Sequence, residues 1–212
     1  MRTIDSLAIF PLGTVLFPGG VLPLRIFEAR YVDMVRECMA SSQPFGVCLI
    51  TRGREVGRPA EHEALGCTAS IADWDMEQPG ILQLRTVGGE RFQILERRTQ
   101  RDGLIRARVE LIDSDPATNI PDEFAMCVTL IERIIEDVDR EEPEDHRRIL
   151  AQPYSPQDAG WVANRLAELL PLDMPSRQHL MSLSDPLQRL ALIHESLREQ
   201  QIIQAKAPGA RS

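Results

Sequence analysis

Cysteine and histidine are the residue types that most often carry covalent or metal chemistry, and this chain has four of each. They are Cys38, Cys48, Cys67 and Cys127, with His62, His146, His179 and His194. No Cys-x-x-Cys pair occurs, although structural zinc sites and redox dithiols use that spacing. No His-Glu-x-x-His pattern occurs either, because Arg198 stands where a second ligand would follow His194. The spacing predicts no metal site, and we expect reduced, mostly buried cysteines.

The sequence gives little indication of catalysis by a nucleophile or by paired carboxylates. Cys48 and Cys67 lie in apolar runs, where a thiol is usually inert packing. Asp73 and Asp75 are paired, but nothing around them marks one as an acid and the other as a base. The chain lacks a P-loop and a Gly-x-Ser-x-Gly motif, and its one lysine is Lys206. We expect no catalytic residue and no cofactor. An enzyme with a site dispersed along the sequence stays open as an alternative.

The charge balance argues against a general nucleic-acid binder. The chain has 212 residues, 32 acidic and 24 basic, and a formal net charge of −8. Phosphate neutralisation needs a basic face, yet the longest basic runs are two adjacent arginines. One group of arginines, at 97, 98, 101, 106 and 108, is close in sequence, and we interpret it as a solvated strand face. A nucleic-acid-binding module is kept as an alternative.

No apolar stretch approaches the ~20 residues that a membrane-spanning helix needs. The amino terminus also lacks a basic region followed by an apolar run and a small-residue cleavage site. We therefore expect a cytoplasmic protein with no membrane partner.

The elements that position these residues change character near Pro116. Before it, short apolar runs predict strands at 7–10, 21–27, 45–50, 66–73, 81–87, 90–96 and 104–111. Pro23 limits the 21–27 strand to a sheet edge or an irregular ladder, and Gly88 and Gly89 predict a hairpin between two strands. Residues 28–39 have apolar spacings of three and four, which predicts one helix. The pattern indicates a small, partly closed barrel of mainly antiparallel strands.

After Pro116 the apolar residues follow helical spacing. Pro121, Pro156, Pro175 and Pro186 stand at expected helix starts, where proline is favoured. The acidic run at 137–145 is interpreted as a solvated linker. We predict an α+β protein with a β-rich domain at 1–116, a helical bundle at 117–204 and a flexible tail at 205–212.

One segment resembles a known family. Phe10-Pro-Leu-Gly13, Val15-Leu-Phe-Pro-Gly19 and Leu22-Pro-Leu-Arg-Ile-Phe-Glu-Ala-Arg-Tyr31 resemble the opening of the amino-terminal domain of Lon (La) proteases. Weaker similarities follow in order at Gly66-Cys-Thr-Ala-Ser-Ile71, Gly88-Gly-Glu-Arg-Phe-Gln-Ile94 and the stretch from Ala163 to Leu190. The resemblance covers roughly residues 5–200. Its departures lie mainly at 51–63 and 73–80, so it does not identify a partner.

The resemblance implies a PUA-like β pseudo-barrel followed by a helical bundle, and recognition of substrate polypeptides. PUA-like barrels elsewhere bind RNA, which is the basis of the nucleic-acid alternative. The absent P-loop and the single Lys206 imply the recognition part without the ATPase and Ser–Lys peptidase modules. We expect a stand-alone, non-catalytic binder of unfolded or specific polypeptides, an adaptor or regulator in protein quality control whose partners include a protease or chaperone.

The binding surface is expected near the edge strand and the helix that follows it. An edge strand can accept an extended chain by strand addition, and a cleft between barrel and bundle could hold apolar side chains. The candidate residues are Phe17, Leu22, Arg25, Phe27, Arg30 and Tyr31. The alternative is that Phe17, Phe27 and Tyr31 belong to the core and the arginines clamp the helix start.

Overall fold

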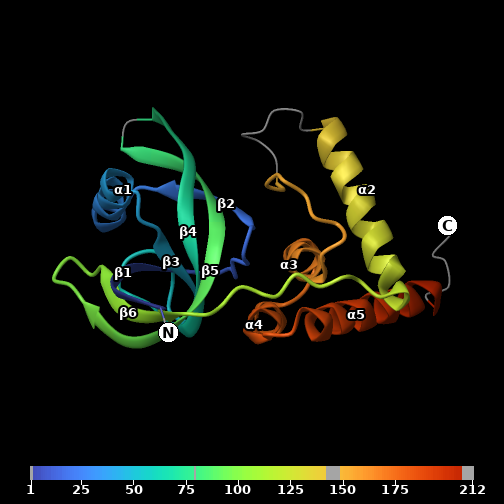
Figure 1. Ribbon diagram of the computed structural model, residues 1–212. Coiled ribbons are helices and arrows are strands. Elements are labelled where there is room, and N and C mark those ends of the chain that lie inside the picture. Colours follow the sequence, from blue (N-terminus) through green and yellow to red (C-terminus); the bar gives the residue numbers. More distant parts are fainter. Residues whose placement is uncertain (1, 79, 142–148, 207–212) are drawn as a thin grey trace.

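The computed structural model describes residues 2–78, 80–141 and 149–206. Figure 1 shows a twisted β-sheet with α1 on one side and the remaining helices together on the other. This is the predicted α+β architecture, with the strands in the first half of the chain and a helical part in the second. Among the described residues, no helix combines the length and apolar character that crossing a membrane requires.

Six strands form one sheet in the order β2-β5-β4-β3-β1-β6, and an additional β5–β6 pairing closes it. The strands are β1 (Arg2–Leu12), β2 (Val21–Ile26), β3 (Phe45–Arg52), β4 (Glu61–Gln78), β5 (Ile81–Thr99) and β6 (Ile105–Leu111). Five strands therefore make a ring, and β2 lies outside it on β5. All pairings are antiparallel except β1 with β3. The predicted barrel of mainly antiparallel strands is confirmed.

The long strand β5 corrects one expectation, because the predicted hairpin at residues 87–90 is wrong. β5 runs without interruption through Gly88 and Gly89. A Cβ atom on Gly88 would lie 2.1 Å from the backbone oxygen of Phe17, and one on Gly89 would lie 2.5 Å from Oγ1 of Thr68. The two glycines thus permit close approach of neighbouring backbone and side chains, which is the other use of glycine inside a strand. The hairpin turn lies instead beyond Gln78, where β4 continues further than the predicted strand end at 73.

Helix α1 (Ala29–Ser41) covers the barrel on the side away from the other helices (Figure 1). Its buried residues include Tyr31, Met34, Val35 and Cys38, which follow the spacing of three and four seen in the sequence. The left-handed conformation of Ser42, with φ 53°, ends the helix, and its N–H donates to the Cys38 carbonyl.

The helical part contains η1 (Asp122–Phe124), α2 (Ala125–Glu141), α3 (Ala159–Leu169), α4 (Met174–Ser182) and α5 (Pro186–Lys206). Three helix starts are capped by aspartate: Asp158 accepts from the N–H of Trp161, Asp173 from that of Ser176 and Asp185 from that of Leu187. α3 thus begins at 159, three residues after the predicted start at Pro156. α2 extends into the predicted linker as far as Glu141, and residues 142–148 lie outside the described residues. The same holds for 207–212 of the predicted tail, while 205 and 206 belong to α5.

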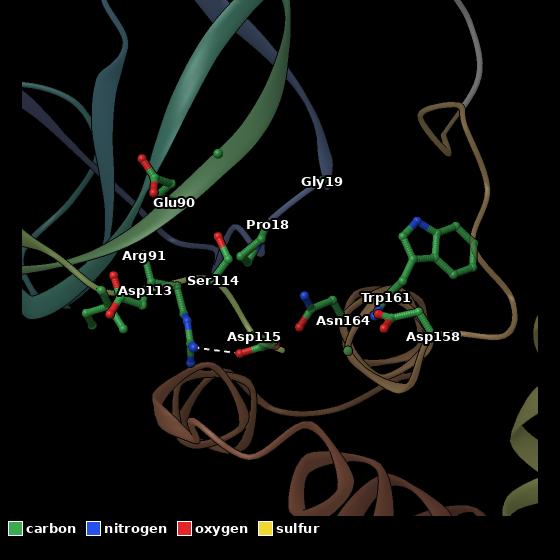
Figure 2. Close-up of a pocket in the computed structure, with 13 residues that line it drawn as sticks. Pro18, Gly19, Glu90, Arg91, Asp113, Ser114, Asp115, Asp158, Trp161 and Asn164 are labelled. Carbon is green, nitrogen blue, oxygen red and sulfur yellow. Dashed lines mark hydrogen bonds and ion pairs between the residues drawn. The ribbon is translucent and has the colours of Figure 1, made fainter. Parts of the chain in front are cut away.

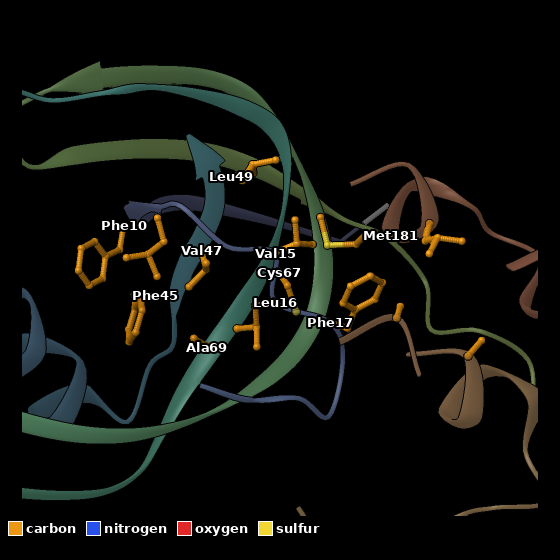
Figure 3. Packing of buried hydrophobic residues seen from close by; sticks show 14 of the residues in the cluster. Phe10, Val15, Leu16, Phe17, Phe45, Val47, Leu49, Cys67, Ala69 and Met181 are labelled. Atoms are coloured by element: carbon orange, nitrogen blue, oxygen red, sulfur yellow. The ribbon is translucent and has the colours of Figure 1, made fainter. Parts of the chain in front are cut away.

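One hydrophobic cluster runs through both parts of the molecule. It joins barrel residues such as Phe17, Phe45 and Cys67 to Met181 and Leu166 of the helices (Figure 3). A second cluster, which includes Leu7, Ile9, Phe92, Ile105 and Val109, lies among β1, β3, β5 and β6. The predicted boundary at 116 falls in the segment between the end of β6 and the start of η1. The shared core packs the barrel and the helices against each other as one body.

Candidate functional site

The outer edge of β2 is the first candidate for a binding surface. β2 pairs with β5 in a ladder that runs from Val21 opposite Val87 to Ile26 opposite Leu82. Gly88 donates its N–H to the carbonyl of Gly20, and hydrogen-bonded positions alternate along an antiparallel ladder. Leu22, whose carbonyl accepts from Oγ1 of Thr86, therefore faces β5 with its backbone groups. The backbone groups of positions 21, 23 and 25 face outward, and Pro23 has no N–H to offer there.

The six predicted site residues divide by exposure. Phe17 is fully buried, and Arg30 and Tyr31 are 8% and 6% exposed. Arg25 is exposed, Leu22 is half-buried, and Phe27 is 54% exposed although it is a large apolar residue. All six lie near β2 and the start of α1, but only the last three can touch a partner in this conformation. The burial of the other three agrees with the alternative interpretation, in which Phe17 and Tyr31 belong to the core and Arg30 clamps the start of the helix.

Arg30 holds the start of α1 and a distant loop together. Its Nη2 donates to Oε2 of Glu28 at 2.7 Å and to the carbonyl of Gly57 at 2.6 Å. Its guanidinium carbon lies 4.8 Å from the centre of the Tyr31 ring, a cation–π distance. Burial is the largest influence on Tyr31, and it raises the pKa of the phenol. Arg30 is therefore a clamp within the fold.

The turn before β2 is held by α3. Nη2 of Arg165 donates to the carbonyl of Pro18 at 2.7 Å, and Oε1 of Glu168 accepts from the N–H of Phe17 at 3.2 Å. Arg165 and Glu168 also form an ion pair at 3.2 Å. Burial raises the pKa of Glu168 to about 7, despite the opposing effect of Arg165. Gly19 has a φ of +74°, a conformation that glycine adopts without strain. The glycine-rich turn in the family resemblance is thus the docking point for a helix.

A cleft of about 240 Å³ lies between this turn and α3 (Figure 2). Its lining combines Trp161, Pro18 and Ile112 with polar side chains that include Asp113, Asp158 and Asn164. Figure 2 shows Trp161 on the α3 side and Pro18 with Gly19 on the barrel side. The predicted cleft is therefore present, and most of its exposed lining is apolar although several polar side chains border it.

Asp115 closes the bottom of the cleft between two buried arginines. Its Oδ1 lies 2.7 Å from Nη2 of Arg91, and its Oδ2 lies 2.6 Å from Nη1 of Arg189. Arg91 also donates to the carbonyls of Met181 and Leu183, and Arg189 to those of Leu180 and Leu183 and to Oδ1 of Asn164. Since Arg91 is on β5 and Arg189 on α5, the network joins barrel to helices. Sequence reasoning missed it, because its members are 24 and 74 residues apart.

The cysteines do not have the surroundings of nucleophiles. All four are free and buried. Burial raises the pKa of Cys38 and Cys127 to about 11 and that of Cys48 to about 12, and it raises that of Cys67 further. A reactive thiol needs the opposite shift. No group of three or more metal-ligating side chains occurs among the residues that the structure describes.

Two members of the arginine group on β5 and β6 form ion pairs with acidic side chains. Arg106 pairs with Glu37, and Nε of Arg108 lies 3.6 Å from Oδ1 of Asp5. Nη1 of Arg97 lies 3.2 Å from Nε2 of His62. Acidic side chains thus lie beside Arg106 and Arg108, while the ladder sets Arg98 directly opposite Arg106.

The family model that matches this chain is the ATP-dependent protease La (LON) substrate-binding domain, over residues 6–199. The chain belongs to the LON substrate-binding domain family. The match spans both the barrel and the helical part, so the family's domain is the whole two-part unit described above.

Solved structures agree with the LON family assignment. A Lon N-terminal domain protein from Xanthomonas campestris is 34% identical, with a TM-score of 0.73 over 91% of this chain and 98% of that one. The N-terminal domain of Lon protease from the Mycobacterium avium complex shares the fold, with a TM-score of 0.60 at 17% identity over 90% of this chain and 97% of that one.

The curated proteins to which this chain is similar are longer than the chain. Lon protease of Syntrophus aciditrophicus is 27% identical over 194 residues, which is 88% of this chain and 24% of that protein. Protein cereblon of Gallus gallus is 37% identical over 101 residues, which is 46% of this chain and 22% of that protein. The matched stretch thus spans about a quarter of these relatives.

Proposed function

We propose that this protein is a non-catalytic adaptor that recognises extended polypeptide segments by strand addition to the outer edge of β2. Substrate binding is the role that the family description gives to this domain. The partners are unfolded or specific polypeptides delivered to a protease or chaperone, which places the protein in cytoplasmic protein quality control.

One observation carries this proposal: another segment of the same chain already forms a β-bridge at the start of that edge. Leu150 forms an isolated antiparallel bridge with Gly20, directly before β2. An edge that accepts one backbone segment in antiparallel orientation has the geometry for β-augmentation. Along β2 the side chains of Arg25 and, just beyond it, Phe27 are exposed and would contact the added strand.

The test compares exposed and buried members of the candidate set. Arg25→Ala and Phe27→Ala should weaken binding in a peptide array, and in fluorescence polarisation with selected peptides, by about tenfold without lowering the melting temperature. Arg30→Ala is the matched control, because loss of a buried clamp should lower the melting temperature while the folded protein keeps its affinity.

A third variant addresses the backbone directly. Arg25→Pro removes an outward N–H without touching the ladder to β5, so it should reduce binding of every peptide that adds to β2 by more than Arg25→Ala does. Unchanged affinity in all three β2 variants would contradict the site. Peptide binding no stronger than that of an unrelated acidic protein would contradict the function itself.

A further inference from the structure

A second unpartnered strand edge lies on β4. β3 begins at Phe45, which pairs with Ala69 of β4, so residues 70–78 of β4 extend past the end of β3. In the described part of the chain these residues pair with β5 alone. With residues 81–87 of β5 and with β2 they form a three-stranded flap that projects beyond the barrel, next to α1 (Figure 1).

Two aspartates cap the backbone along this edge. The N–H of Trp74 donates to Oδ1 of Asp73 at 2.9 Å, and the N–H of Met76 donates to Oδ1 of Asp75 at 2.6 Å. These donors are two residues apart and therefore point to the same side of the strand, away from β5. Charged side chains on an edge protect it against uncontrolled pairing. Since both aspartates are exposed, the carbonyl of an incoming strand can replace either carboxylate.

A groove of about 440 Å³ adjoins the same edge, between the end of α1 and the flap. It is lined by Cys38, Met39, Ser42, Gln43, Ser70, Ile71, Ala72, Asp73 and Trp74. Trp74 is 50% exposed and Met39 38%, and Met76, which follows Trp74 on the same face of the strand, is 45% exposed. Three large apolar side chains thus stand half in water beside an open backbone edge.

The other face of the strand is acidic, because Asp73 and Asp75 alternate with Trp74 and Met76. Asp73 is opposite Arg85 in the ladder, but Asp75 is opposite the uncharged Gln83. Successive side chains of an added strand point to alternate faces, so one set would meet the groove and the other the aspartates. Charge complementarity selects basic residues for the second set.

We propose that the edge of β4 at residues 70–78 binds an extended polypeptide in which large apolar residues alternate with lysine or arginine. An apolar side chain occupies the groove against Trp74 and Met39, and a basic one lies beside Asp75. The inference rests on the polypeptide recognition proposed above, and it names the class of segment recognised and a second surface for it.

The two tryptophans of the chain allow the two surfaces to be observed separately. Trp161 lines the cleft beside the turn before β2, and Trp74 lines the groove. In Trp161→Phe the emission reports on the groove alone, and in Trp74→Phe on the cleft alone. A short peptide of alternating leucine and lysine should shift the emission of the first variant to shorter wavelength. The same peptide with glutamate in place of lysine should not.

Affinity measured by polarisation then tests the contacts. Trp74→Ala and the double variant Asp73→Asn, Asp75→Asn should each bind the leucine–lysine peptide about tenfold more weakly at unchanged melting temperature. Leu95→Ala, which removes an exposed apolar side chain of β5 that lies in neither proposed surface, is the control and should leave this affinity unchanged.

The outcomes separate the two proposals. Unchanged Trp74 emission together with wild-type affinity in Trp74→Ala would overturn the groove site, while weaker binding in the β2 variants would keep the proposed function. A response of Trp74 with no effect of the β2 variants would support the groove and overturn the β2 site. Absence of binding by any peptide would overturn both.

Discussion

The carboxylate of Asp115 lies 2.7 Å from the guanidinium of Arg91, and this ion pair joins the barrel to the segment that leads into the helices. Arg189 of α5 shares the same carboxylate. Two buried cations thus depend on a single anion, and backbone carbonyls together with Oδ1 of Asn164 accept from several of their other N–H groups. Burial lowers the pKa of Arg91 and outweighs the opposing effect of Asp115.

Replacement of Asp115 by asparagine should destabilise the protein strongly. The change keeps the shape but leaves two buried guanidiniums without a counter-charge, which costs about 3–5 kcal/mol of unfolding free energy. The measurement is urea unfolding of the whole chain. Asp113→Asn is the matched control, since the Asp113 side chain is 99% exposed and its loss should change little. Equal stabilities of the two variants would contradict a structural role for the pair.

Gly88→Ala should destabilise the junction between β5 and the turn before β2. The new Cβ would meet the carbonyl oxygen of Phe17 at 2.1 Å, so backbone has to move, at a cost of about 1–3 kcal/mol. Gly13→Ala is the control, because its Cβ would approach only the end of the exposed Glu55 side chain, at 3.1 Å. Thermal unfolding of both variants tests this. A melting temperature of Gly88→Ala equal to that of the wild type would show that the two backbone segments can move apart at little cost.

Glu168 should make stability depend on pH in a defined window. Its pKa is raised from 4.5 to about 7 on folding, so its contribution is full below about pH 4.5 and is lost as pH rises through 7. Unfolding free energies of the wild type and of Glu168→Gln should be measured from pH 5 to pH 8. As pH rises, the unfolding free energy of the wild type should fall relative to that of the variant. The change in their difference should be about 1–3 kcal/mol. A difference independent of pH would contradict the raised pKa.

The four cysteines should resist alkylation in the native protein. Their raised pKa values keep the thiols protonated at pH 8, and burial blocks access. Iodoacetamide followed by mass spectrometry should find four unmodified thiols before urea and four modified ones after it. Rapid labelling of Cys48 or Cys67 in the native state would revive the nucleophile alternative.

Local patterns predicted most elements of the fold and a partly closed barrel, but not which strands close it. The spacing of Tyr31 and Cys38 indicated α1, and Pro23 indicated an edge strand, because both are properties of neighbouring residues. The pairing of β5 with β6 that closes the ring depends on register between distant strands. Gly88 and Gly89 misled the prediction because a glycine pair suits a hairpin turn and a close approach equally, and the sequence does not show that Phe17 lies beside them.

The candidate site was predicted in outline. β2 is an edge strand, as Pro23 indicated, but the binding role of this region stays a prediction, and the burial of Phe17, Arg30 and Tyr31 follows from packing that a linear pattern does not contain. Asp73 and Asp75 were noticed only as paired acids. Their role as caps for the N–H groups of Trp74 and Met76 became visible once β4 proved to run past the end of β3.

The continuity of β5 has a mechanical consequence. Within one strand it pairs with β2 up to Val87, carries Arg91 four residues later, and then pairs with β6 from Phe92 onward. A load applied to either edge of the flap therefore passes along a single stiff backbone to the ion pairs on Asp115, and from there to α5.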